Sequence, residues 1–153
     1  MKAVYKGNPA VILLVEDDRA DQELTRRALE ESKLHNELRI IEDGEEALAY
    51  LFRHGKYKNP AISPRPDLLL LDLNLPRVDG RQVLEEIRAD ESLRCMVVVV
   101  LTTSRQEKDI RRSYELGCNS FITKPSRMDQ FIRVVQTMGE YWFQIVTLPP
   151  KTE

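Results

Sequence analysis

Polar side chains that could do chemistry follow four apolar runs of the sequence. They are the carboxylates of Glu16, Asp17 and Asp72, the hydroxyl of Thr102 and the ammonium of Lys124. A carboxylate can attack phosphorus, a lysine can bind a phosphoryl group as a point charge, and a hydroxyl can donate to one of its oxygens. Phosphoryl transfer asks a protein mainly to position groups and to neutralise charge. These residue types predict a phosphoryl-transfer site if the chain brings the four positions together.

The run before Asp72 has the pattern of a strand that is covered on both faces. Leu68 to Leu71 are four leucines without alternation, as in a parallel sheet under helices. Pro66 and Pro76 bracket the run and disfavour a long helix through it. A second continuous apolar run, Val11–Val15, also ends on acid. An acid at the carboxyl end of such a strand lies where open α/β sheets place their ligands.

Strand patterns alternate with helix patterns along the chain. Strands are expected at 11–15, 38–41, 68–71, 96–101 and 120–123, and a helical pattern of apolar residues follows each of them. Strands that alternate with helices indicate βαβ units, whose right-handed crossovers place helices on both faces of a parallel sheet. We therefore predict an α/β fold, a doubly wound (βα)5 flavodoxin-like domain with a parallel five-stranded sheet in the order 2-1-3-4-5.

That strand order would crowd Glu16, Asp17 and Asp72 together, because the first and third strands become neighbours. Like charges a few Å apart destabilise a fold unless a cation lies among them. A small number of oxygen ligands suits Mg²⁺ with several retained waters. Thr102 and Lys124 would lie across the cluster. The purely structural alternatives are that Glu16 and Asp17 cap the first helix and that Thr102 is an ordinary residue at the end of a strand.

Length and charge narrow the class of protein. The 153 residues suit one domain, which we expect at residues 11–140, after an N-terminal arm at 1–10 and before a C-terminal extension at 141–153. The 23 basic and 25 acidic residues argue against a general nucleic-acid binder. No apolar run approaches a bilayer span and no signal peptide is evident, so a cytoplasmic protein without membrane contact is expected. Cys95 and Cys118 lack zinc spacing and are expected to be buried free thiols.

Four motifs carry a resemblance to a known family. They are Val15-Glu16-Asp17-Asp18, Leu71-Asp72-Leu73-Asn74-Leu75-Pro76 with Asp79-Gly80, Leu101-Thr102-Thr103, and Lys124-Pro125. With these motifs in order and at strand ends, the sequence from about residue 11 to 140 resembles the receiver domain of the two-component response regulators.

The resemblance implies a role for each matched residue. Asp72 would accept a phosphoryl group from a phosphohistidine of a sensor histidine kinase. Thr102 would bond a phosphoryl oxygen, and Lys124 would pair with the phosphoryl group. The peptide bond from Lys124 to Pro125 is often cis in the family. Phe121 would be the aromatic switch position, although it could also be a plain core residue. Asp17 would bind Mg²⁺ directly, and Glu16 would bind it through a water molecule. Asp72 and the backbone carbonyl of Asn74 would be the other protein ligands.

The sequence departs from the family pattern at three places. Thr103 stands where the family usually has a smaller residue, which would narrow access to the site. Phe121 lacks the hydroxyl of a tyrosine, so a switch there is expected to work by packing alone. The long loop from Arg53 to Pro66 and the absence of an effector domain resemble single-domain regulators that are paired with phytochrome-type kinases.

Surface features predict an interaction partner. The segment Tyr141–Val146 is unusually apolar, so it is expected to pack on the domain or across a symmetric dimer. The working hypothesis is a homodimer through this extension and the face formed by the fourth helix, fifth strand and fifth helix. Ser104 and Ser126 are expected to cap the fourth and fifth helices.

These residues are compatible with three different functions. The first is a phosphoacceptor that signals by a conformational or dimerisation switch, supports its own phosphorylation and slow dephosphorylation, and is not a turnover enzyme. The second is a phosphohydrolase with an aspartyl nucleophile on a similar sheet. In the enzymes compared, a second acid follows the nucleophile by two residues, whereas Asn74 stands here and cannot act as a general acid. The third is a scaffold that is never phosphorylated, which the intact set of site residues disfavours.

Overall fold

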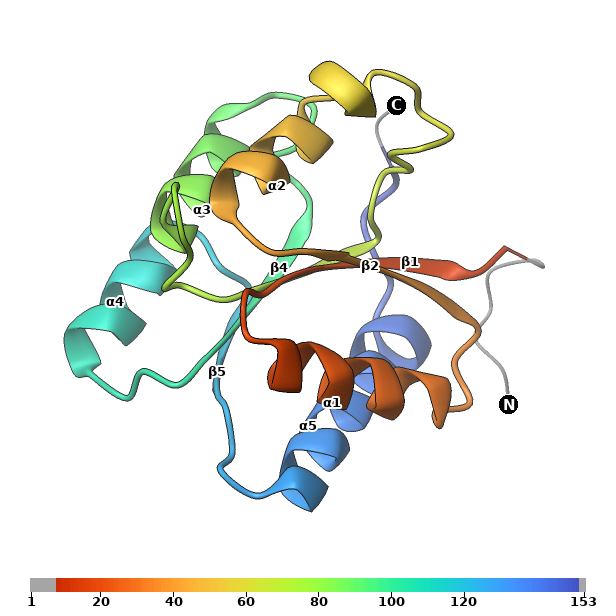
Figure 1. Cartoon of the computed structure of the whole chain (residues 1–153), viewed down its shortest axis with the longest axis vertical. Helices are drawn as coiled ribbons and strands as arrows, with labels where there is room; N and C mark the ends of the chain where they lie inside the picture. Colours follow the sequence, from red (N-terminus) through yellow and green to blue (C-terminus); the bar gives the residue numbers. More distant parts are fainter. Residues whose placement is uncertain (1–7, 152–153) are drawn as a thin grey trace.

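The computed structural model describes residues 8–151, and within them strands and helices alternate (Figure 1). The strands are β1 (Ala10–Val15), β2 (Asn36–Ile41), β3 (Leu68–Leu71), β4 (Val97–Thr102) and β5 (Ser120–Thr123). The helices are α1 (Arg19–Glu30), α2 (Gly44–Leu51), α3 (Gly80–Ala89), α4 (Glu107–Glu115) and α5 (Met128–Glu140), with two short turns, η1 (Gly55–Tyr57) and η2 (Tyr141–Ile145).

The strands form one parallel sheet in the order β2-β1-β3-β4-β5, which confirms the predicted doubly wound flavodoxin-like fold. Val15 at the end of β1 lies opposite Leu71 at the end of β3. The N–H of Asp72 donates to the carbonyl of Val15 at 3.1 Å, so the hydrogen-bond ladder between these strands continues one residue past the end of β3. The register therefore places Glu16 beside Asp72.

Helices cover both faces of the sheet, with α1 and α5 on one side and α2, α3 and α4 on the other (Figure 1). Successive leucines of β3 divide between two cores. Leu68 and Leu70 belong to the core with α1 and α5, whereas Leu69 and Leu71 belong to the core with α2 and α3. All four are fully buried, and each such side chain contributes about 1.5–3 kcal/mol to folding. The unbroken leucine run is thus explained by a strand that has no wet face.

Two predicted helix caps and one predicted buried thiol are wrong. The residues that precede α4 and α5 are Gln106 and Arg127, and neither caps through its side chain. The hydroxyl of Ser104 instead donates to the carboxylate of Asp109 at 2.5 Å, so it is engaged by a side chain inside the helix. Cys118 is buried as expected, but Cys95 is exposed because it precedes β4 at the surface end of the strand.

The segment between α2 and β3 is fixed by hydrogen bonds to the domain. The Tyr50 hydroxyl donates to the carbonyl of Pro64 at 2.7 Å, and the Tyr57 hydroxyl of η1 donates to the carboxylate of Glu46 at 2.6 Å. The buried Ser63 hydroxyl donates to the carbonyl of Tyr57 at 2.8 Å. This loop is therefore ordered, with one short helical turn in it.

The C-terminal segment lies partly in the core and partly at the surface. Phe143 of η2 is buried in the core next to α1 and α5, and Trp142 and Leu148 pack against the same core. Tyr141 and Ile145 remain exposed. The predicted arm at residues 1–10 falls mainly outside the described residues, since β1 already begins at Ala10.

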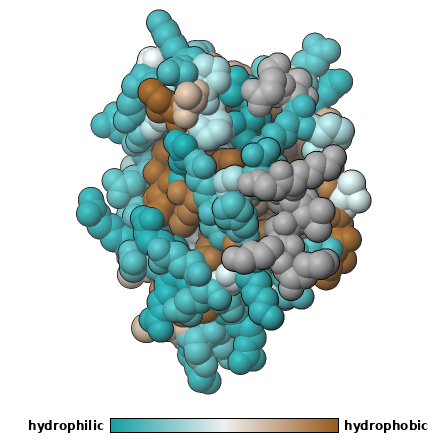
Figure 2. All heavy atoms as spheres, turned by 90° about the vertical axis from the view of Figure 1, so that its right-hand side faces the viewer, coloured by the Kyte–Doolittle hydropathy of each residue, from teal (hydrophilic) through white to brown (hydrophobic). Residues whose placement is uncertain are grey.

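A helix that spans a membrane must be both long and apolar. Among residues 8–151, no helix is both long enough and apolar enough to cross a bilayer. On the face at the right-hand side of Figure 1, hydrophilic side chains surround small hydrophobic areas (Figure 2). Such a mixture is ordinary for a protein surface.

Candidate functional site

Asp72 stands at the carboxyl end of the central strand and is almost buried, with 8% of its surface exposed. One carboxylate oxygen accepts a hydrogen bond from the N–H of Leu73 at 2.7 Å. The other oxygen accepts from the ammonium of Lys124 at 3.1 Å. Backbone and lysine together hold this carboxylate in a fixed orientation at the edge of the sheet.

Carboxylate oxygens of Glu16, Asp17 and Asp72 lie within 4.8 Å of one another. Glu16 is buried, Asp17 is exposed, and Asp72 lies at the base of the group. Three carboxylates at this spacing form an all-oxygen donor set that fits a hard divalent cation with open positions for water. The exposed position of Asp17 gives such an ion a route from solvent.

Close packing against α3 fixes the backbone at Asp72. A Cβ atom placed on Gly80 would lie 2.2 Å from the carbonyl oxygen of Asp72, which is far inside van der Waals contact. The N–H of Gly80 donates to the carbonyl of Leu73 at 2.8 Å. The helix therefore begins against the site loop, and only a glycine allows this approach.

Lys124 reaches the carboxylates from the end of β5 and is 7% exposed. Within the described part of the chain its ammonium contacts three carboxylates, at 2.5 Å for Glu16, 2.7 Å for Asp21 and 3.1 Å for Asp72. Its own N–H donates to the carbonyl of Thr102 at 2.7 Å, so the ends of β4 and β5 are joined at the site. The peptide bond from Lys124 to Pro125 is trans, in contrast to the form that the resemblance favours.

Burial and charge shift the pKa values of the site in opposite ways. The pKa of Glu16 is raised to about 7, because burial and the negative charge of Asp72 together outweigh the hydrogen bond from Lys124. Burial acts to lower the pKa of Lys124, but its bonds to Asp21 and Glu16 outweigh this and the pKa is raised. The lysine therefore stays charged at neutral pH. A divalent cation beside Glu16 would favour the ionised carboxylate.

Thr102 carries the most informative feature of the site. Its side chain is fully buried, and its hydroxyl has no hydrogen-bond partner among the described residues. An unsatisfied buried hydroxyl costs about 1–3 kcal/mol, so such a group is rare unless it has a use. Because Thr102 is joined to Lys124 through the backbone, its free donor lies at the same strand ends as the charged groups.

Phe121 and Asn74 are close in sequence to residues of the site, three residues before Lys124 and two residues after Asp72. Asn74 is exposed in the loop after Asp72. Phe121 is half-buried on β5 and packs against the core next to α2 and α3. Its N–H donates to the hydroxyl of Tyr114 on α4 at 3.2 Å. This bond ties the backbone of Phe121 to α4, and the role of the Phe121 side chain as a switch that works by packing stays a prediction.

The structure thus brings Glu16, Asp17, Asp72 and Lys124 into one group, as the sequence predicted, with Thr102 next to Lys124. The sequence analysis missed Asp21, which contacts Lys124 from the first turn of α1. An acid in a first turn normally indicates interaction with the helix dipole, so its type and position gave no signal of this contact.

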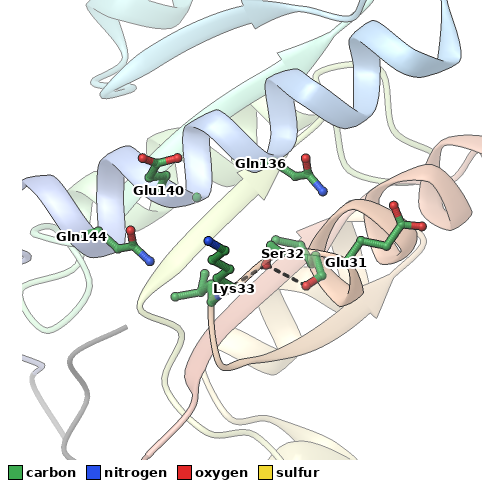
Figure 3. A pocket seen from close by; sticks show the side chains of 9 residues that line it. Glu31, Ser32, Lys33, Gln136, Glu140 and Gln144 are labelled. Carbon is green, nitrogen blue, oxygen red and sulfur yellow. Dashed lines mark hydrogen bonds between the residues drawn. The ribbon is translucent and has the colours of Figure 1, made fainter. Parts of the chain in front are cut away.

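A separate pocket lies at the far end of α1, between that end and α5 with η2 (Figure 3). It has a volume of about 430 Å³, and polar side chains such as Lys33, Gln136 and Gln144 line it. The pocket shares no lining residue with the carboxylate group, so it is not part of the candidate site.

Known proteins resemble this chain over nearly its whole length. Residues 12–136 match the family model of the response regulator receiver domain. Response regulator Rcp1 of Synechocystis sp. is 48% identical over 141 residues, which cover 92% of this chain and 94% of that protein. Probable methanogenesis regulatory protein FilR2 of Methanothrix harundinacea is 41% identical over 135 residues, or 88% of this chain and 84% of that protein.

Two solved structures of response regulators are also similar to this chain over nearly its whole length. The Mn²⁺-bound form of response regulator Rcp1 is 46% identical, covers 93% of this chain and 100% of its own, and has a TM-score of 0.87. The phosphorylated cyanobacterial phytochrome response regulator RcpA is 45% identical, covers 94% of this chain and 100% of its own, and has a TM-score of 0.89.

Proposed function

The chain belongs to the response regulator receiver domain family, and from this membership and its site we propose that Asp72 accepts a phosphoryl group from a phosphohistidine of a sensor histidine kinase. The receiver unit is assigned to residues 11–140, with 141–153 as an extension. The protein is a phosphoacceptor in a signalling pathway.

One observation carries this proposal: the buried Thr102 hydroxyl without an acceptor, at strand ends that also hold a lysine and three carboxylates. A phosphoryl oxygen on Asp72 would supply the missing acceptor. The resting protein carries the cost of the unsatisfied hydroxyl, and that cost is removed when the phosphoryl group arrives.

The transfer needs one bond made and one broken. A carboxylate oxygen of Asp72 attacks phosphorus, the bond from phosphorus to the imidazole nitrogen breaks, and the electron pair stays on the leaving imidazole. Thr102 donates to one phosphoryl oxygen, and Lys124 neutralises part of the added charge. The acyl phosphate is later hydrolysed slowly by water, which restores Asp72. The phosphorylated form persists as the signal between these two steps, so the protein acts as a phosphoacceptor rather than as a turnover enzyme.

Glu16, Asp17 and Asp72 would hold the divalent cation, which we assign as Mg²⁺, together with the backbone carbonyl of Asn74. The all-oxygen donor set supports this choice. When bound, the ion would neutralise negative charge between the carboxylates and the incoming phosphoryl group. Lys124 would take the opposite side of the group.

We assign the conformational change that follows phosphorylation to the surface near Phe121. We propose that the kinase that phosphorylates Asp72 is of the phytochrome type. The similarity to Rcp1 and RcpA supports the kinase class, because RcpA is a phytochrome response regulator. Exposed Tyr114 on α4, with Tyr141 and Ile145 of η2, supports a homodimer through α4, β5, α5 and the extension. No direct contact with nucleic acid is proposed, and a cytoplasmic location stays a prediction.

A phosphohydrolase with an aspartyl nucleophile gains no support. Asn74 occupies the position at which the compared enzymes place their acid, and an amide cannot protonate a leaving group. The matched proteins named above are regulators rather than hydrolases.

Intact-mass measurement tests the proposal. The protein is incubated with acetyl phosphate with and without Mg²⁺, beside Asp72→Asn. We expect one phosphoryl adduct on the wild type with Mg²⁺, and none without the ion or on the variant. A Mg²⁺-dependent adduct of the same yield on Asp72→Asn would refute the assignment.

A further inference from the structure

All three N–H donors of the Lys124 ammonium are engaged by carboxylates of the described chain. They reach Glu16, Asp21 and Asp72 at 2.5, 2.7 and 3.1 Å. An ammonium has only three donors, so it can give a phosphoryl group on Asp72 the donor that now reaches the Asp72 carboxylate. Any further bond from Lys124 to that group requires the release of Glu16 or Asp21.

Asp21 differs from the other two partners because it lies outside the carboxylate group that fits a cation, which consists of Glu16, Asp17 and Asp72. It belongs to the first turn of α1, where its N–H donates to the capping carboxylate of Asp18 at 3.0 Å. Its backbone is therefore fixed by the helix, whereas its side-chain carboxylate accepts the hydrogen bond from Lys124.

The three partners also differ in what their release would cost. The side chain of Asp21 is 23% exposed, whereas those of Glu16 and Asp72 are 3% and 10% exposed. Water can solvate the carboxylate of Asp21 after the lysine leaves it. In the absence of a cation, a release of Glu16 would leave a buried charge without a partner, which costs several kcal/mol.

We propose that Asp21 is a positioning residue that holds Lys124 in the resting protein and competes with the phosphoryl group for its ammonium. This inference rests on the proposed function, because it assigns a regulatory role within the same site. The strength of the contact between Asp21 and Lys124 therefore sets how strongly the ammonium can bind the phosphoryl group. It keeps the lysine at the site in the resting state and makes phosphorylation less favourable than it would be without this competitor.

The test is the rate of phosphorylation by acetyl phosphate in Asp21→Asn, with Glu23→Gln as the matched control. Both substitutions remove one negative charge from α1, but Glu23 is 73% exposed and pairs with Arg26 at 3.7 Å. We expect phosphorylation of Asp21→Asn to be about two- to fivefold faster than wild type, the range of a partly exposed ion pair. The rate of Glu23→Gln should stay unchanged.

Two further measurements separate positioning from a structural effect. Asp21→Glu restores the charge and should bring the rate back toward wild type. The Mg²⁺ affinity of Asp21→Asn, measured by titration calorimetry, should stay within about twofold of wild type, because Asp21 lies outside the cation-binding group. A larger change in affinity would overturn the inference.

The outcomes also separate this inference from the proposed function. If the wild type forms no adduct at Asp72, the proposed function fails. If the wild type is phosphorylated but Asp21→Asn is as slow as Glu23→Gln or slower, the function stands and the competing role of Asp21 is refuted.

Discussion

The N–H of Phe121 on edge strand β5 donates to the hydroxyl of Tyr114 on α4, with 3.2 Å between nitrogen and oxygen. This bond joins the helix to the strand three residues before Lys124. A change at the phosphoryl site can therefore reach the α4 surface through β5, because the same short strand ends at the site and is bonded to α4.

Tyr114→Phe should loosen this connection without changing the site. We expect the free energy of unfolding to fall by about 0.5–1.5 kcal/mol, the value of one hydrogen bond. The amide of Phe121 should exchange with deuterium faster than in wild type. Tyr141→Phe, which changes an exposed tyrosine of η2, is the control and should leave that amide unaffected. Equal exchange in Tyr114→Phe and wild type would show that the hydroxyl does not protect Phe121.

Thr102→Val should stabilise the resting fold and impair phosphorylation. Valine keeps the shape and removes the unsatisfied hydroxyl, so the free energy of unfolding should rise by about 1 kcal/mol in urea titration. The phosphorylation rate should fall by about tenfold or more, because a donor to the transferred group is lost.

The control for this pair of effects is Thr123→Val on the neighbouring strand. The Thr123 hydroxyl donates to the carbonyl of Ser104 at 3.4 Å, so its removal should not stabilise the protein. A Thr102→Val variant that is less stable than wild type would argue that the hydroxyl has a partner in solution.

Gly80→Ala should destabilise the protein and displace the Asp72 backbone. The added Cβ would meet the carbonyl oxygen of Asp72 at 2.2 Å, and backbone must shift to admit it. We expect a loss of about 1–3 kcal/mol, as for overpacking. Gly139→Ala on α5 is the matched control, since its Cβ would meet Leu34 at 3.7 Å in ordinary contact. It should gain about 0.5–1 kcal/mol in helix stability. Equal effects of the two substitutions would contradict the close approach.

The bond from Tyr57 to Glu46 should make stability depend on pH. The hydrogen bond from Tyr57 lowers the pKa of Glu46 in the folded protein below its ordinary value of 4.5. The stabilisation is therefore present above about pH 4.5 and is lost as the pH falls through the lower folded pKa. Tyr57→Phe should cost about 1 kcal/mol at pH 7 and less in acid.

Tyr50→Phe provides the comparison for this pH dependence. The Tyr50 hydroxyl donates to the neutral carbonyl of Pro64, so the cost of its removal should not change between pH 7 and acid. Urea titrations of both variants at several pH values check this. A pH-independent cost for Tyr57→Phe would rule out the charged acceptor.

The strand order and most of the site could be predicted because they depend on patterns that are local in sequence. The leucine run Leu68–Leu71 indicated a strand buried on both faces, and parallel strands share one edge, so Asp72 had to lie near the acids after β1. Each step used one short segment and one general rule about sheets.

The contacts of Asp21 and Tyr114 could not be predicted in this way. Each joins a side chain on a helix to a strand end, and the choice of partner depends on how the helix is rotated against the sheet. Ser104 is not the cap because α4 begins only at Glu107, so the Ser104 hydroxyl accepts from the N–H of Gln106 before the helix and donates to Asp109 within it. Cys95 was predicted to be buried from its apolar neighbours, although it lies just outside the strand that buries them.

Chemical location of the phosphoryl group tests the central claim most directly. The protein is phosphorylated with acetyl phosphate and Mg²⁺ and then treated with borohydride, which reduces an acyl phosphate to the alcohol, and its peptides are sequenced by mass spectrometry. We predict homoserine at position 72 and unchanged aspartate at positions 17 and 21. Homoserine at another position, with Asp72 intact, would contradict the account.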